Sequence, residues 1–232
     1  MSIRDNIMQV QERLAEAALR SGRDPEAVTL VAVSKTVGVS QVKEAMDAGV
    51  SHFAENRVQM LLEKQKEERL AYPQTDWHLI GHLQTNKVKY VIDRVSLIHS
   101  VDSLHLAQEI DRQAEKHGRI MPVLLELNIS GEESKFGLSP CEIDDFMEGF
   151  EKLQYVKCMG LMTMAPRSAE TPEKRKIFRK LYNIYVDMGK QTIYNVDMSI
   201  MSMGMSNDFE VAVEEGSNMV RIGTSIFTQD KT

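Results

Sequence analysis

Short apolar runs alternate with longer segments of helical periodicity along nearly the whole chain, and this alternation constrains the fold more than any other feature. Such a pattern is typical of repeated strand and helix units that build a parallel sheet. The apolar runs predict strands at residues 28–34, 50–54, 76–80, 96–100, 121–127, 155–160, 194–198 and 219–222. The other segments predict helices at residues 3–21, 40–48, 56–69, 85–92, 103–117, 140–151, 171–189 and 207–215. Eight strands separated by helices, after an extra N-terminal helix, predict an α/β fold, a closed (β/α)₈ TIM barrel.

The length and the even composition favour one domain. TIM barrels typically need about 250 residues, and the 232 residues of this chain suit a compact version. Proline and glycine are scattered, and no low-complexity tract separates the two halves. We therefore expect a single domain over residues 1–232.

The charge balance argues against nucleic acid and membranes as partners. Lys plus Arg is 28 and Asp plus Glu is 34, a net charge of −6, which gives no general attraction to either polyanion or anionic lipid. Five basic residues crowd residues 174–180, where a solvated helical face is the favoured interpretation and a local basic patch is the alternative.

Targeting and cysteine signals indicate a cytoplasmic protein. Residues 1–6 lack the apolar region of a signal peptide, and no stretch approaches the length that spans a bilayer. The two cysteines, Cys141 and Cys158, have no metal-ligand spacing. We expect two reduced thiols and no metal site.

Lys35 ends the first predicted strand, directly after the apolar run 28–34. A lysine held partly out of water has a lowered pKa, because desolvation disfavours the ammonium. The neutral amine can form a Schiff base with an aldehyde, and pyridoxal 5′-phosphate (PLP) is the common biological aldehyde held in this way. A lysine that only marks the strand end and reaches solvent is the alternative, and it is the more common case for a single such residue.

The other predicted strand ends are also polar, and the active site of a TIM barrel lies at the C-terminal ends of its strands. These strand-end residues are Ser34, Lys35, Glu55, Asn56, Arg57, His78, Gly81, His82, Asn128, Thr163, Ser202 to Ser206, Arg221, Gly223 and Thr224. The segment 202–208 follows the seventh predicted strand and offers two hydroxyls, a glycine and a helix start, which suit a phosphate. A turn that caps a helix explains the same segment equally well.

Arg221 lies at the end of the eighth predicted strand, followed by Gly223 and Thr224, which are candidates to complete a phosphate site. A guanidinium does not release its proton in a protein. If Arg221 reaches the ring nitrogen of a bound pyridine, it keeps that nitrogen unprotonated and weakens the cofactor as an electron sink.

Seven segments, in order along the chain, resemble the family of pyridoxal phosphate homeostasis proteins, which share the barrel of the alanine racemase N-terminal domain. The matching segments are residues 32–36 (Ala-Val-Ser-Lys-Thr), 53–59, 77–87, 128–137, 160–164, 199–206 and 221–224. The resemblance implies that Lys35 forms the Schiff base with PLP and that Asn56 lies beside the cofactor. It implies a phosphate site made by Ser202, Met203, Gly204, Met205, Ser206, Gly223 and Thr224, with Arg221 facing the pyridine nitrogen.

The resemblance also implies a role: binding PLP and keeping the pools of PLP and of amino and keto acids in balance, with PLP-dependent apoenzymes as candidate recipients. Two-base racemisation needs an acid/base group on each face of the substrate. In alanine racemase the second group comes from a further domain of the partner subunit, and this chain stops after the barrel. We therefore expect no catalytic turnover and a monomer. A weak PLP-dependent amino-acid racemase or lyase is the alternative, with His82 or a water as second base. A cofactor-free interaction barrel is a third hypothesis. Solvent exposure is the favoured interpretation for His82, Lys87, Lys89 and Lys135.

Overall fold

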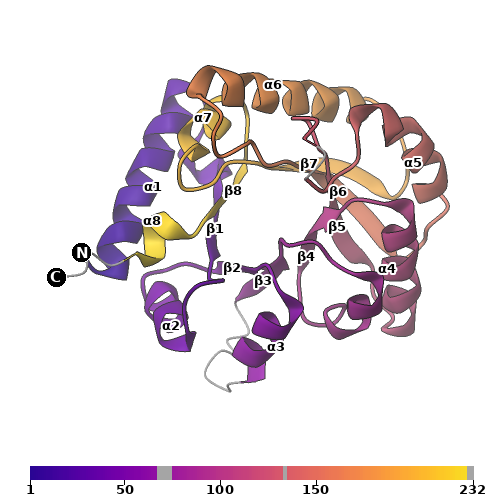
Figure 1. Ribbon diagram of the computed structural model, residues 1–232, viewed down its shortest axis with the longest axis horizontal. Helices are drawn as coiled ribbons and strands as arrows, with labels where there is room; N and C mark the ends of the chain where they lie inside the picture. The colour runs from indigo at the N-terminus through magenta and orange to yellow at the C-terminus, as the bar shows by residue number, and fades with distance from the viewer. Residues whose placement is uncertain (67–74, 133–134, 229–232) are drawn as a thin grey trace.

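The computed structural model describes residues 1–66, 75–132 and 135–228, and it shows a closed barrel of parallel strands with helices around it (Figure 1). Each strand pairs with its neighbours along the chain, and β8 pairs with β1. The strands are β1 (Thr29–Val33), β2 (His52–Glu55), β3 (Asp76–Leu79), β4 (Leu97–Val101), β5 (Met121–Glu126), β6 (Val156–Met162), β7 (Val196–Ser202) and β8 (Met219–Ile222). The predicted TIM barrel with an N-terminal helix is thus confirmed.

The helices follow the strands in the predicted order. They are α1 (Ile3–Arg20), α2 (Val39–Asp47), α3 (Val58–Lys66), α4 (Leu104–Lys116), α5 (Ile143–Phe150), α6 (Thr171–Met188), α7 (Phe209–Glu214) and α8 (Thr224–Phe227). Residues 85–92, predicted as a helix, contain only a short 3₁₀ helix, Thr85–Tyr90. Another 3₁₀ turn, Pro140–Glu142, precedes α5. Residues 67–69 of the predicted helix 56–69 lie outside the described residues.

Alternation along the strands divides the apolar side chains between two cores. Side chains such as Ala32 and Phe53 point outward and pack against the helices in a large core. Their neighbours Val31 and Ala54, with Met162 from β6, point inward and form a smaller cluster inside the barrel. Successive residues of a strand point to opposite faces, so each short apolar run contributes to both cores.

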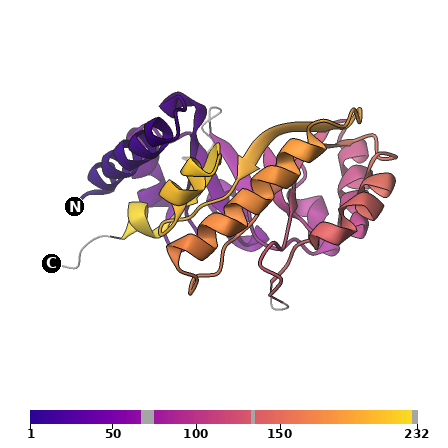
Figure 2. The same ribbon diagram turned by 90° about the horizontal axis from the view of Figure 1, so that it is seen from above.

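The helices α1 and α8 meet where the barrel closes. Figure 2 shows α1 (indigo) beside α8 (yellow), with α6 (orange) running along the outside of the barrel. The side-chain amide of Asn6 in α1 donates to the carbonyl oxygens of Ile226, at 2.9 Å, and Thr228, at 3.1 Å. The N-terminal helix therefore covers the junction between β1 and β8.

The seventh strand is longer than predicted, and this corrects the position of Ser202. The sequence predicts a strand at 194–198 followed by a loop, whereas β7 runs to Ser202, which pairs with Met162 of β6. A side chain on Gly160, where φ is +145°, would place its Cβ 1.7 Å from the carbonyl oxygen of Ile200. Only glycine permits this close pairing, which continues β7 past the predicted end.

Candidate functional site

Lys35 lies in a tight turn directly after β1, and its side chain is exposed. The backbone N–H of Val37 donates to the carbonyl oxygen of Ser34 at 3.0 Å and closes this turn. Of the two interpretations that the sequence left open for Lys35, partial burial and exposure to solvent, the structure shows the exposed side chain. The amine of Lys35 is therefore sterically accessible at the C-terminal end of the barrel.

A buried ion pair lies beneath the turn that carries Lys35. The ammonium of Lys64, from α3, donates to the carbonyl oxygen of Ser34 at 2.6 Å and to the Glu55 carboxylate. The hydroxyl of Ser34 donates to the same Glu55 oxygen, Oε1, at 2.6 Å. Glu55 is fully buried and Lys64 is 3% exposed. The residue before Lys35 is thus fixed by two buried charges, which strengthen hydrogen bonds in a region of low dielectric.

Asn56 follows β2, is half-buried and is held by the neighbouring strand end. A side chain on Gly81 would place its Cβ 2.1 Å from the carbonyl oxygen of Asn56. The loop after β3 can approach Asn56 this closely only because residue 81 is glycine. Sequence reasoning identified both residues at strand ends but not their contact.

The loops after β7 and β8 lie side by side. The backbone N–H of Arg221 donates to the carbonyl oxygen of Gly204 at 3.0 Å, and the N–H of Ser225 contacts the hydroxyl of Ser206 at 3.3 Å. Met203 and Gly204 are buried, Met205, Ser206 and Gly223 are half-buried, and Thr224 is exposed. All of the predicted phosphate residues except Ser202 thus lie in these two adjoining segments, which include the start of α8 at Thr224.

The end of β8 packs tightly against the end of β1, which carries Lys35. Ala32 of β1 pairs with Ile222 of β8. A Cβ on Gly223 would lie 3.0 Å from the carbonyl oxygen of Val33. The amine of Lys35 and the loops after β7 and β8 therefore share the same sector of the barrel rim.

Arg221 is buried inside the barrel, 3% exposed. Its Nη1 donates to the carbonyl oxygen of Ser202 at 2.9 Å and to the Ser202 hydroxyl, and its Nη2 donates to the carbonyl oxygen of Thr163 at 3.0 Å. A guanidinium has five N–H donors, so two of them have no hydrogen-bond partner among the described residues. Burial lowers the pKa of Arg221 to about 10, which leaves it charged at neutral pH.

Three histidines from consecutive strands form a row inside the barrel, which we call the imidazole row: His52, His78 and His99. Nδ1 of His52 lies 3.2 Å from Nε2 of His78, and Nδ1 of His78 lies 2.9 Å from Nε2 of His99. Nδ1 of His99 lies 3.1 Å from the hydroxyl of Ser202. Burial lowers the pKa of His78 to about 3 and holds the pKa of His99 well below its usual value, so both imidazoles are neutral.

Two further titratable groups lie at neighbouring strand ends. Burial raises the pKa of Glu126, the last residue of β5, to about 7, against the opposing effect of Arg221. His82 is exposed, as expected, but Nδ1 lies 2.9 Å from a carboxylate oxygen of Asp102, and its ring stacks on Phe136 with centroids 3.9 Å apart. Lys135 is half-buried and ion-paired with Glu132 at 2.7 Å, so the expectation of a freely solvated lysine is wrong.

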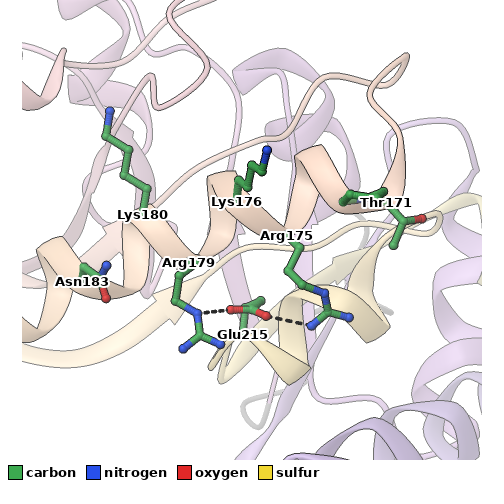
Figure 3. A pocket seen from close by; sticks show the side chains of 8 residues that line it. Thr171, Arg175, Lys176, Arg179, Lys180, Asn183 and Glu215 are labelled. Carbon is green, nitrogen blue, oxygen red and sulfur yellow. Dashed lines mark hydrogen bonds and ion pairs between the residues drawn. The ribbon is translucent and has the colours of Figure 1, made fainter.

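A hollow of about 630 Å³ lies on the outer surface of the barrel, along α6 and the end of α7 (Figure 3). Arg175 and Arg179 point toward the buried Glu215 and pair with it, whereas Lys176 and Lys180 point away from it. These are four of the five basic residues that the sequence placed on a solvated helical face; the fifth, Lys174, is buried and lies 3.6 Å from the carboxylate of Asp208. None of the residues that line the hollow comes from the strand ends, so it is separate from the Lys35 site.

Within the described residues, no cluster of three or more His, Cys, Asp or Glu could hold a metal ion. The same part of the chain contains no helix with the length and apolar character needed to cross a bilayer. Cys141 is exposed, Cys158 is buried, and both are free thiols.

Sequence reasoning missed His52, His99, Lys64 and Glu126 as parts of the site. One signal for the histidines was available: each of three consecutive predicted strands, or its flank, carries a histidine. Lys64 gave no such signal, because a lysine within an amphipathic helix ordinarily lies on the solvated face.

Comparison with known proteins agrees with this geometry. Residues 2–230 match the family described as alanine racemase, N-terminal domain. The alanine racemase of Clostridium difficile 630 has a TM-score of 0.75 over 100% of this chain and 57% of its own, but only 16% identity, so this likeness shows the fold alone. The class is therefore a (β/α)₈ barrel of the alanine racemase N-terminal type.

Closer relatives cover the full length. A pyridoxal phosphate homeostasis protein from Aquifex aeolicus is 41% identical over 231 residues, 100% of both chains. One from Pseudomonas aeruginosa is 38% identical over 97% of this chain and 95% of its own. PipY of Synechococcus elongatus, solved with PLP bound, has a TM-score of 0.82 and 36% identity over 94% of this chain and 100% of its own. The chain belongs to the family of pyridoxal phosphate homeostasis proteins.

Proposed function

We propose that this chain binds PLP as a Schiff base on Lys35 and carries or buffers it, contributing to the intracellular balance of PLP and of amino and keto acids. One observation carries the proposal: the accessible amine of Lys35 directly follows β1, and β1 pairs with β8, which holds a buried guanidinium with unused donors. The names of the relatives and the PLP bound to PipY support the same cofactor.

The donor set suits the three parts of PLP. Lys35 supplies the amine for the aldehyde, and Ser206, Thr224 and the backbone at Gly204 and Gly223 supply donors for the phosphate. Asn56, held in place against Gly81, lies at the next strand end. Ser202 has its hydroxyl occupied by Arg221 and His99, so we assign the phosphate to the residues after it.

The unused donors of Arg221 suit the ring nitrogen of the pyridine. When bound, PLP supplies an electron sink, and this depends on a protonated ring nitrogen. Arg221 can only donate a hydrogen bond, so it keeps that nitrogen in the acceptor form. This arrangement favours storage and transfer of the cofactor over catalysis.

A weak PLP-dependent racemase or lyase is the second candidate. It draws on Glu126, whose pKa of about 7 makes it able to exchange a proton at neutral pH, and on the His82–Asp102 pair. Incubating the PLP-loaded protein with L-alanine and L-serine, with chiral analysis of the products, distinguishes it. Turnover that is lost in Glu126→Gln supports this candidate, and no turnover supports the carrier.

We also propose that residues 1–232 act as a single PLP-binding domain, that the protein is a cytoplasmic monomer, and that PLP-dependent apoenzymes receive the cofactor. Light scattering of the purified protein tests the monomer. Activation of a PLP-dependent apoenzyme by the loaded protein, compared with the same concentration of free PLP, tests the transfer.

The decisive experiment locates the adduct. The purified protein is mixed with PLP, its visible absorbance is recorded, the complex is reduced with borohydride, and the modified lysine is identified by peptide mass spectrometry. We expect one adduct, on Lys35, and its loss in Lys35→Ala.

Lys43→Ala is the matched control, because Lys43 is an exposed lysine on α2, shortly after Lys35 in the chain. It should keep the adduct. An adduct that survives in Lys35→Ala, or that is equally reduced in Lys43→Ala, would contradict the proposed function.

A further inference from the structure

The hydroxyl of Ser202 connects the imidazole row to Arg221. Ser202 is fully buried at the end of β7. Its oxygen accepts a hydrogen bond from Nη1 of Arg221 and lies 3.1 Å from Nδ1 of His99. A guanidinium has no acceptor atom, so the direction of the bond from Arg221 is fixed.

We propose that His99, acting through Ser202, is a positioning residue for Arg221, and that His78 and His52 hold His99 in the single tautomer this role needs. This inference rests on the proposed function, in which Arg221 faces the PLP ring nitrogen. It assigns a role to an inward-facing row on β2, β3 and β4, which in the order of the barrel lie on the other side of β1 from β8, the strand of Arg221.

The hydroxyl proton of Ser202 decides the tautomer of His99. Among the described residues, Nδ1 of His99 is the one acceptor in contact with that hydroxyl. Buried hydroxyl protons are rarely left unpaired, because this costs the full desolvation penalty. Nδ1 of His99 therefore accepts, and the proton of this neutral imidazole is on Nε2.

The tautomer of His99 fixes the tautomer of the next histidine in the row. Nε2–H of His99 donates to Nδ1 of His78 across 2.9 Å. His78 consequently carries its proton on Nε2 and donates to Nδ1 of His52 across 3.2 Å. With the other tautomer, the Nδ1–H of His99 and the Nη1–H of Arg221 would both donate to the Ser202 oxygen. The hydroxyl proton of Ser202 would then have no acceptor.

The charges around the row keep it in this state. Arg221 on β8 is positive and lies directly beyond Ser202, so an imidazolium at His99 would face a like charge as well as burial. At the other end, His52 is 30% exposed and has Asp76 of β3 at 3.8 Å. Glu126 on β5 acts on the charge of Arg221. Burial and the positive charge of Arg221 therefore keep His99, at the interior end of the imidazole row, neutral.

The first test measures the tautomers directly. Long-range ¹H–¹⁵N NMR correlation on uniformly ¹⁵N-labelled protein without added PLP assigns the proton of each imidazole. We expect His78 and His99 as neutral Nε2–H tautomers from pH 6 to pH 8. A protonated Nδ1 on His99, or an imidazolium signal there, would overturn the inference.

The second test asks whether His99 acts through Arg221. His99→Phe removes the acceptor and should raise the dissociation constant for PLP about fivefold, the range for one lost hydrogen bond. His99→Asn offers an acceptor at the position of Nδ1 and should restore most of the affinity, whereas His99→Gln offers one at the position of Nε2 and should not. His105→Phe, on the exposed side of α4, is the matched control and should bind as the unchanged protein does.

A double-mutant cycle separates positioning from a general structural role. In an Arg221→Lys background, His99→Phe should change the PLP dissociation constant by less than about twofold, because the group it positions is already altered. A full fivefold effect in that background would overturn the inference. A Lys35 adduct with no effect of His99→Phe would overturn it while the proposed function stands. Absence of any Lys35 adduct would overturn the proposed function, and the NMR result would still decide the row.

Discussion

Two regions of the barrel hold a buried cation by opposite means. In the first, which we call the Lys35 region, the buried ammonium of Lys64 is matched by the carboxylate of Glu55. In the second, the Arg221 region, the guanidinium is bound by neutral oxygens of Ser202 and Thr163, beside a row of neutral imidazoles. The first region balances charge with charge, and the second surrounds one charge with oriented dipoles.

The difference separates what each region contributes. The ion pair fixes Ser34, and Lys35, the next residue in the turn, is exposed. The dipoles leave Arg221 with donors to spare but fix its position. Under the proposed function, an accessible amine combined with a preorganised partner for the ring suits the loading and release of a cofactor. The stability of the Lys35 region should depend on the presence of each charge of the ion pair. The stability of the Arg221 region should depend on the protonation states of its titratable groups.

The largest effect is expected from removing one charge of the ion pair. Lys64→Met leaves Glu55 buried without its cation, and this should lower the free energy of unfolding by about 3–5 kcal/mol. Urea denaturation followed by circular dichroism measures it, with Lys66→Met, an exposed lysine in the same helix, as control. Equal effects of the two substitutions would show that the ion pair is not essential.

Glu126 should make the Arg221 region less stable as the pH rises. Its pKa is about 7 in the folded protein against 4.5 ordinarily, so the folded state keeps a proton that the unfolded chain releases between these values. The contribution of Glu126 is full below pH 4.5 and declines through pH 7, by about 2–3 kcal/mol. Urea titrations at pH 5 and pH 7 should show this decline in the unchanged protein relative to Glu126→Gln. The same pH dependence in both proteins would show that Glu126 does not cause the loss of stability.

His78 should act in the opposite direction. Its pKa of about 3 lies below the ordinary 6.5, so the unfolded chain takes up a proton that the folded protein does not. The stability it provides is complete above pH 6.5 and is lost as the pH falls, by about 2 kcal/mol at pH 5. His78→Gln should remove that loss in the same titrations, with His105→Gln as the matched surface variant. A profile unchanged by His78→Gln would refute the neutral row.

The smallest effect is expected at Ser34. Ser34→Ala removes one hydroxyl from the ion pair but leaves both charges in place, and it should cost about 1–2 kcal/mol. Thermal unfolding compared with Ser40→Ala, an exposed serine in α2, measures the difference. A loss as large as that of Lys64→Met would mean that the hydroxyl, not the ion pair, anchors the turn.

The fold could be predicted because the sequence of each strand and helix is by itself typical of that structure. The runs around Val31, Phe53 and Ile98 have the length and β-branched or aromatic content of strands, and the segments between them have helical periodicity. Lys35 and Asn56 could be placed at the C-terminal end of the barrel for the same reason, since each directly follows a strand, or the turn after it, whatever the register is. The burial of Arg221 inside the barrel depends on the direction in which its side chain points within β8. Ser202 was misplaced because its strand continues through contacts with β6 that no local pattern reports.

The contacts inside the barrel could not be predicted in this way. His99 and Ser202 are 103 residues apart in the chain and come from β4 and β7, which are not neighbours in the barrel. Their contact depends on strand tilt and on register, which a sequence pattern leaves open. The same applies to Lys64 and Glu55, whose pairing depends on how α3 packs against the outside of β2.

The pairing of β1 with β8 has a consequence for how this protein is made. Thr29 and Met219 are partners in the barrel, so its last seam joins segments separated by most of the chain. Contacts of such long sequence separation slow folding, since a large loop must close before they form. A nascent chain on the ribosome exposes an unpaired edge of β1 until β8 emerges. Arg221 lies in that final strand of the barrel, so the proposed cofactor site is complete only after β8 has been synthesised.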